Sequence, residues 1–153
     1  MATSRADAQT QTSRQKEFYS DFLDSFAASP IGGSLAKVTN ERSVKQSIKN
    51  LILTNLGGFD LNTNKRVAGE RLFQPLIGSD VNRSLFENSD LSTFTTVKQG
   101  IEDTIKNYEP RATLIAVDVT GSNDEQYMIV NIVFSVINNT NPINLTLNLR
   151  RVR

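Results

Sequence analysis

The sequence predicts an α+β fold, in which amphipathic helices pack on a C-terminal antiparallel sheet of three strands. Apolar side chains recur at helical spacing in two long segments, and after Pro110 they alternate with polar ones up to the C-terminus. Pro110 separates the two patterns because it cannot join a helix interior. In a chain of 153 residues we expect a single domain over residues 40–153, preceded by an N-terminal arm over residues 1–39.

Composition excludes several classes of site. The chain has no cysteine, which rules out a disulfide framework, a thiolate zinc site and a cysteine nucleophile. It also has no histidine, so Ser-His-Asp and HExxH arrangements are excluded. A net charge of +1 gives no case for broad nucleic-acid binding. No apolar run approaches the roughly 20 residues that span a bilayer, and no signal peptide is evident. We expect a soluble chain made in the cytosol, without metal or cofactor.

The N-terminal arm leaves two interpretations open. Residues 1–16 are polar, without periodic apolar positions, and are predicted to be disordered. Three phenylalanines then recur every four residues, which suits one face of a short helix: Phe18, Phe22 and Phe26. Because Pro30 and two glycines close this segment, an extended arm is equally compatible with the sequence.

A helix is predicted over residues 41–55, with Asn40 as its N-cap. Its apolar side chains share one face: Val44, Ile48, Leu51 and Ile52. Gly57 and Gly58 are expected to end it, and residues 59–68 to form a polar loop without regular structure.

An irregular segment is predicted over residues 69–78, because glycines bound it and Pro75 interrupts it. We expect its apolar side chains to anchor it: Leu72, Phe73 and Ile77. Asp80 is expected to cap a short helix that runs to Glu87.

The clearest helical pattern covers residues 92–107. Its apolar side chains fall within about a third of the helical wheel: Leu91, Phe94, Val97, Ile101, Ile105 and Tyr108. Charge pairs four residues apart add support, at Lys98, Glu102 and Lys106. We expect the face with Phe94 and Ile101 to pack on the sheet.

Three strands follow Pro110. The first covers residues 114–119 and the second residues 128–136, with a turn at 121–124 between them. After a turn at 138–142, the last strand covers residues 143–152. A terminal strand this regular is either the covered edge of the sheet or a strand offered to another subunit.

The junction between helix and sheet carries the most informative motif, Glu109-Pro110-Arg111. In an extended chain, side chains two residues apart point the same way, so the carboxylate and the guanidinium should project together. One interpretation is a helix stop with a surface ion pair, worth only about 0 to 1 kcal/mol. The other is a docking point for another protein. On an exposed corner, Arg111→Ala should leave the fold intact.

Glycosidase chemistry is not predicted. It needs two carboxyl groups about 5 to 9.5 Å apart, one of them with a raised pKa. The candidates all lie in polar or exposed contexts, without an apolar run to desolvate them: Glu87, Asp90, Glu102 and Glu109. Solvated charges are the better interpretation.

Six segments of the sequence carry a resemblance to a known protein family. The segments that carry it are Val44–Thr54, Gly69–Pro75, Leu85–Asn88, Asn107–Arg111, Leu114–Val119 and Ile129–Asn138. They resemble the small baseplate wedge proteins of contractile-tailed bacteriophages, especially of the T-even type, and a similar component exists in the type VI secretion baseplate. The resemblance covers residues 40–153. Residues 57–68 look like an insertion relative to that family.

The resemblance implies a structural role without catalysis, in the tail baseplate of the virion after assembly in the host cytoplasm. It implies several copies in a six-fold ring beside the tail tube. Glu109, Pro110 and Arg111 would contact the helical core bundle of the wedge. The terminal strand would accept the first sheath subunit by strand addition, through Ile143, Asn144, Leu145, Thr146, Leu147, Asn148, Leu149, Arg150, Arg151 and Val152. The family also carries a lysozyme label, so a peptidoglycan hydrolase is the alternative.

Overall fold

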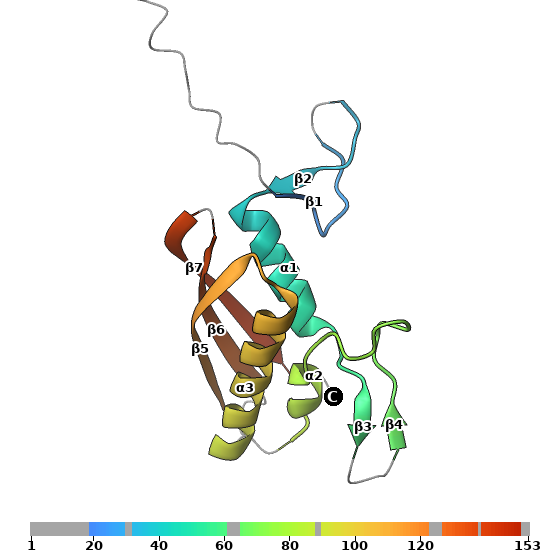
Figure 1. Cartoon of the computed structure of the whole chain (residues 1–153), viewed down its shortest axis with the longest axis vertical. Coiled ribbons are helices and arrows are strands. Elements are labelled where there is room, and N and C mark those ends of the chain that lie inside the picture. The colour runs from blue at the N-terminus through green and yellow to red at the C-terminus, as the bar shows by residue number, and fades with distance from the viewer. Residues whose placement is uncertain are drawn as a thin grey trace, which may run out of the picture. The chain divides into compact units, whose positions relative to one another are not determined.

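The computed structural model describes residues 19–29, 32–60, 65–87, 90–122, 127–137 and 139–150 (Figure 1). The chain divides into two compact units, Met1–Asn40 and Glu41–Arg153. No helix within the described ranges is both long enough and apolar enough to cross a membrane.

The first unit contains a short hairpin. Strand β1 (Ser20–Phe22) pairs antiparallel with β2 (Lys37–Thr39). Of the two interpretations of this arm, the structure therefore shows extended chain and no helix over residues 19–29. Phe22 and Phe26 are both exposed. Phe18 and the stretch predicted to be disordered lie outside the described residues.

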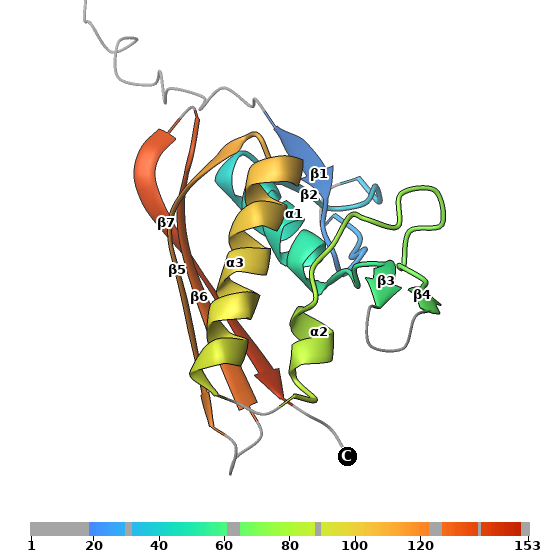
Figure 2. The same cartoon turned by 60° about the horizontal axis from the view of Figure 1, so that its bottom comes forward.

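The second unit has the predicted α+β architecture. Its sheet consists of β5 (Ala112–Ser122), β6 (Tyr127–Val136) and β7 (Asn139–Arg150), antiparallel in the order β5-β6-β7. Helix α3 (Leu91–Tyr108) lies along β5, and α1 (Glu41–Leu53) contacts both α3 and β7 (Figure 2). The expectation of helices on a three-stranded antiparallel sheet is confirmed.

The core forms where the two helices meet the inner face of the sheet. Alternate side chains of β6 are buried from Met128 to Val136, as the period of two predicted. The helices add their apolar stripes, with Val97, Ile101 and Ile105 from α3 and Val44, Ile48 and Ile52 from α1 all buried. Phe134 is the largest fully buried side chain. Each such side chain stabilises the fold by about 1.5 to 3 kcal/mol.

Helix α3 begins one residue earlier than predicted. Asp90 has extended backbone, and its carboxylate accepts a hydrogen bond from Thr93 N at 2.8 Å. This bond from the Thr93 backbone lowers the pKa of Asp90. Leu91 is consequently the first residue of the helix, where it is 82% exposed although it belongs to the predicted apolar stripe.

The strands are longer than predicted, and the second turn is shorter. Strand β7 starts at Asn139 and includes Pro142, so the turn expected at residues 138–142 was wrong. An edge strand tolerates proline, because the missing N–H can face away from the ladder. Gly121 also belongs to β5, where an added Cβ would lie 3.2 Å from the Phe94 ring. Residues 123–126 and 138 lie outside the described ranges.

The residues predicted as an unstructured polar loop include a second hairpin. Strand β3 (Gly58–Asp60) pairs antiparallel with β4 (Lys65–Val67). At its base two glycines pass in backbone contact, since a Cβ on Gly57 would clash with the backbone of Gly69. The glycines therefore permit a chain crossing, and do not end α1, which stops earlier.

Polar groups of α2 and of the loop before it satisfy carbonyl groups at the C-terminal end of α1 and just beyond it. Ser79 Oγ donates to Ile52 O at 2.5 Å, and Ser79 N donates to Thr54 O at 2.9 Å. Asn82 Nδ2 donates to Leu53 O and to Asn55 Oδ1, both at 2.9 Å. These hydrogen bonds join the end of α1 to α2.

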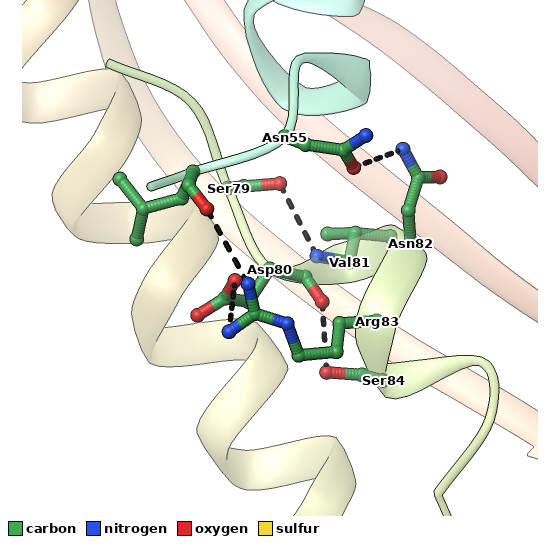
Figure 3. Close-up of polar contacts among 8 residues, drawn as sticks. Asn55, Ser79, Asp80, Val81, Asn82, Arg83 and Ser84 are labelled. Atoms are coloured by element: carbon green, nitrogen blue, oxygen red, sulfur yellow. Dashed lines mark hydrogen bonds and ion pairs between the residues drawn. The ribbon is translucent and has the colours of Figure 1, made fainter. Parts of the chain in front are cut away.

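Helix α2 (Val81–Ser84) is shorter than the predicted helix to Glu87. Asp80 occupies the N-cap position but makes no side-chain cap bond. Its carboxylate pairs with Arg83 at 3.3 Å instead, as Figure 3 shows. A 3₁₀-type turn follows, in which Phe86 N donates to Arg83 O three residues earlier.

Two buried serines give opposite expectations for stability. Ser43 Oγ in α1 is buried and has no hydrogen-bond partner among the described residues, so Ser43→Ala should leave the free energy of unfolding unchanged or raise it by up to about 1 kcal/mol. Ser79→Ala removes the donor to Ile52 O and should cost about 1 to 3 kcal/mol. Urea unfolding of both variants checks this. A larger loss for Ser43→Ala than for Ser79→Ala would contradict it.

Candidate functional site

The junction between α3 and β5 is built by Glu109, Pro110 and Arg111. Helix α3 ends at Tyr108, and Glu109 is its C-cap, with Glu109 N donating to Ile105 O at 2.9 Å. Pro110 stops the helix as predicted. Ala112 N then donates to Glu109 O at 3.1 Å, and the chain enters β5.

Glu109 and Arg111 form a two-pronged ion pair. Arg111 Nε donates to Glu109 Oε1 at 2.6 Å, and Arg111 Nη2 donates to Oε2 at 2.7 Å. Such parallel charge-assisted hydrogen bonds fix the plane of the guanidinium as well as its position. The prediction that these two side chains lie together is confirmed.

The prediction of an exposed corner was wrong for Glu109. Its side chain is only 3% exposed, whereas that of Arg111 is 34% exposed. Ser47 from α1 covers the carboxylate, with its Oγ donating to Glu109 Oε2 at 2.6 Å. The pair is therefore no ordinary surface salt bridge. Loss of Arg111 would leave a buried carboxylate short of donors, so Arg111→Ala should destabilise the fold.

The environment of Glu109 favours its ionised form. Burial by itself would raise the pKa of Glu109, but hydrogen bonds from Arg111 and Ser47, together with the charge of Arg111, outweigh it and hold the pKa below its usual value. A carboxylate that stays ionised holds Arg111 in place and is not a proton donor.

The second candidate is the outer edge of β7, which pairs with β6 alone in the described part of the sheet. The side chains of Leu145 and Leu147 are buried on the inner face of the sheet. The intervening side chains are exposed: Asn144, Thr146, Asn148 and Arg150. Near the start of the strand Lys45 Nζ donates to Asn144 O at 2.7 Å, so α1 covers that part of the edge. Arg151 and Val152 lie outside the described residues.

The other three candidate carboxylates are less buried than Glu109. Glu87 and Asp90 are exposed, and Glu102 is half-buried on α3. Within the described ranges no group of three or more acidic residues is placed to hold a metal ion.

Sequence reasoning missed two features. Ser47 interrupts the apolar side of α1, but its partner Glu109 lies 62 residues away, so no local pattern reveals the contact. The second feature is an exposed apolar tip, which we define as Leu72, Phe73 and Leu76. Leu72 and Phe73 were expected to anchor the segment, and Leu76 was not singled out. Their side chains point away from the core instead, with Phe73 96% exposed.

Residues 38–141 match a protein family described as baseplate wedge protein gp25. A curated relative, baseplate wedge protein gp25 of Enterobacteria phage T4, is 38% identical over 102 residues, which are 67% of this chain and 68% of the relative.

Two solved structures share the fold. A putative tail lysozyme from Geobacter sulfurreducens superposes with a TM-score of 0.58 at 18% identity, over 74% of this chain and 92% of its own. A chain of the anti-feeding prophage baseplate superposes with a TM-score of 0.55 at 19% identity, over 85% of this chain and 83% of its own. At these identities the likeness concerns the fold alone.

Acid should destabilise the protein through Glu109. Because its folded pKa lies below the ordinary 4.5, its contribution is present above that pH and is lost as the pH falls through the folded pKa. We expect the free energy of urea unfolding to fall less steeply from about pH 5 to about pH 3 in Glu109→Gln than in the unsubstituted chain.

Glu87→Gln changes an exposed carboxylate and serves as the control for net charge. It should keep the acid slope of the unsubstituted chain. Equal slopes in Glu109→Gln and Glu87→Gln would contradict the role given to Glu109.

Proposed function

This chain belongs to the baseplate wedge protein gp25 family, and from that premise we propose that it joins wedge proteins to the tail tube region of a contractile phage tail and starts the sheath there. The family match over residues 38–141 is the observation that carries the proposal, because it includes helices α1, α2 and α3, the junction, and strands β5 and β6. We further propose that several copies form a six-fold ring after assembly in the host cytoplasm.

The Glu109-Pro110-Arg111 junction is proposed to bind the helical core of the wedge. Pro110 is exposed and Arg111 is one-third exposed, whereas Glu109 is buried, so a partner would meet the guanidinium and the proline ring. Glu109 then acts through Arg111, which it holds in one orientation. A pre-oriented guanidinium loses less conformational entropy on binding.

The C-terminal strand is proposed to receive the first sheath subunit by strand addition. The outer edge of β7 pairs with no other described strand, and unpaired N–H and C=O groups form a template for another chain. No acidic residue follows Gln126, and three of the last four residues are arginines: Arg150, Arg151 and Arg153. Such a cationic end suits an acidic partner surface.

A peptidoglycan hydrolase is the weaker candidate. Hydrolysis of a glycosidic bond needs one carboxyl group with a raised pKa, whereas the pKa values of Glu109 and Asp90 are both lowered. The oxygens of Glu109 are also held by Arg111 and Ser47. We propose that the chain has no hydrolytic activity.

The proposed role of Arg111 can be separated from its structural role with Arg111→Lys. Lysine keeps a positive charge beside Glu109 but loses the planar fork. We expect a folded chain that joins wedges lacking this protein at least about ten-fold more weakly, as judged by co-sedimentation.

Arg83→Lys is the matched control, since Arg83 pairs with Asp80 in an exposed salt bridge away from the junction. It should join wedges normally. Normal assembly of a folded Arg111→Lys chain would contradict the role of the junction.

Ending the chain after Leu149 tests the terminal strand. Of the ladder between the described parts of β6 and β7, the last pair, Tyr127 with Arg150, is lost, so the chain should fold and enter baseplates while sheath polymerisation starts poorly. Electron microscopy of baseplates supplied with sheath protein measures this. A full-length chain with Arg150, Arg151 and Arg153 replaced by glutamine isolates the effect of charge. Sheath that starts equally well on the shortened chain would show that the strand is only structural.

A further inference from the structure

The apolar tip presents large side chains to solvent at a position where nothing in the fold needs them. Leu72 is 89% exposed, Phe73 96% and Leu76 63%. Single exposed apolar side chains are common, but three within five consecutive positions form a patch, and such patches mark interaction sites.

The backbone beneath the tip is firmly attached to the rest of its unit. Pro75 O accepts a hydrogen bond from Gly57 N at 2.7 Å, and Glu70 N donates to Asn55 O at 3.2 Å. Gly78 O accepts from Thr104 Oγ1 of α3 at 2.9 Å. A Cβ added to Gly69 would lie 2.5 Å from Pro75 O, so the path of the chain allows little variation. A tip held in this way binds without a large cost of ordering.

The tip adjoins the Glu109-Pro110-Arg111 junction. Tyr108, the residue before Glu109, donates from its hydroxyl to Leu76 O at 3.1 Å. One partner surface can therefore reach both Leu76 and Arg111. The same bonds make strand addition at the tip unfavourable, because Leu76 O and Pro75 O are already used.

The exposed charges beside this surface are mainly positive. Arg71 is exposed beside Leu72, and the side chain of Arg111 is 34% exposed. Of the two nearby carboxylates, Glu109 is buried, whereas Glu70 is exposed and accepts a hydrogen bond from Asn55 Nδ2 at 2.8 Å. With two exposed guanidinium groups against one exposed carboxylate, a groove bordered by carboxylates is complementary.

We propose that the apolar tip docks into an apolar groove with acidic borders on the same baseplate protein that contacts Arg111. This inference rests on the proposed function, since it extends the junction's interface to Leu72, Phe73 and Leu76. The apolar side chains supply the buried contact, and Arg71 orients it.

Photocrosslinking identifies the occupant. Benzoylphenylalanine is introduced at position 73, at position 110 and, as a control, at position 91, and each full-length chain is assembled with wedges lacking this protein. Leu91 is also exposed, but it lies at the other end of α3, about 25 Å from Tyr108. We expect positions 73 and 110 to crosslink to one protein, with acidic residues beside the site reached from position 73. A crosslink from position 73 to a second copy, to sheath or tube protein, or to no protein overturns the inference.

Binding to the same wedges gives an independent measure. The variant Leu72→Ala/Phe73→Ala should bind at least about ten-fold more weakly, because it removes the two most exposed side chains of the tip, whereas Leu91→Ala should bind normally. Unchanged thermal unfolding would exclude misfolding. If Arg111→Lys weakens binding and the tip variant does not, only this inference fails. If neither weakens it, the proposed function of the junction fails as well.

Discussion

The buried contact among Glu109, Arg111 and Ser47 is the interaction on which the second unit depends. Glu109 caps α3, Arg111 leads into β5 and Ser47 lies on α1, so one carboxylate joins three elements. Arg111 O also accepts from Ile137 N at 3.1 Å, which connects the junction to the end of β6. Burying a charge is unfavourable unless its hydrogen bonds are satisfied, and both oxygens of Glu109 are satisfied here. The direction in which α3 meets the sheet is thereby set.

The elements that could be predicted from the sequence are those determined by local periodicity. The alternation along β6 and the apolar stripe of α3 both follow from neighbouring residues, so the layers and the antiparallel sheet were predicted correctly. The burial of Glu109 could not be predicted, because it depends on Ser47 in a distant helix. The hairpin of β3 and β4 was missed because its short strands carry no apolar alternation.

The apolar tip shows why apolar composition alone misleads. Leu72 and Phe73 looked like anchors because such residues are usually buried. The segment is anchored instead by backbone hydrogen bonds and by close backbone contacts at Gly57, Gly69 and Gly78. These contacts need no side chain, and a glycine in an irregular segment can be read equally well as a flexible turn. Only the three-dimensional path distinguishes the two cases.

In the second unit, the residues that stabilise the fold differ from the residues that are exposed to partners. Folding uses the inner face of the sheet and the apolar stripes of α1 and α3. It leaves exposed the edge of β7, the guanidinium of Arg111 and the apolar tip. Each of these three features is attached to a buried group: the leucines of β7, Glu109, and the backbone that crosses at Gly57. A component of a large assembly needs this combination, because surfaces held rigidly before contact lose little entropy when the partners bind.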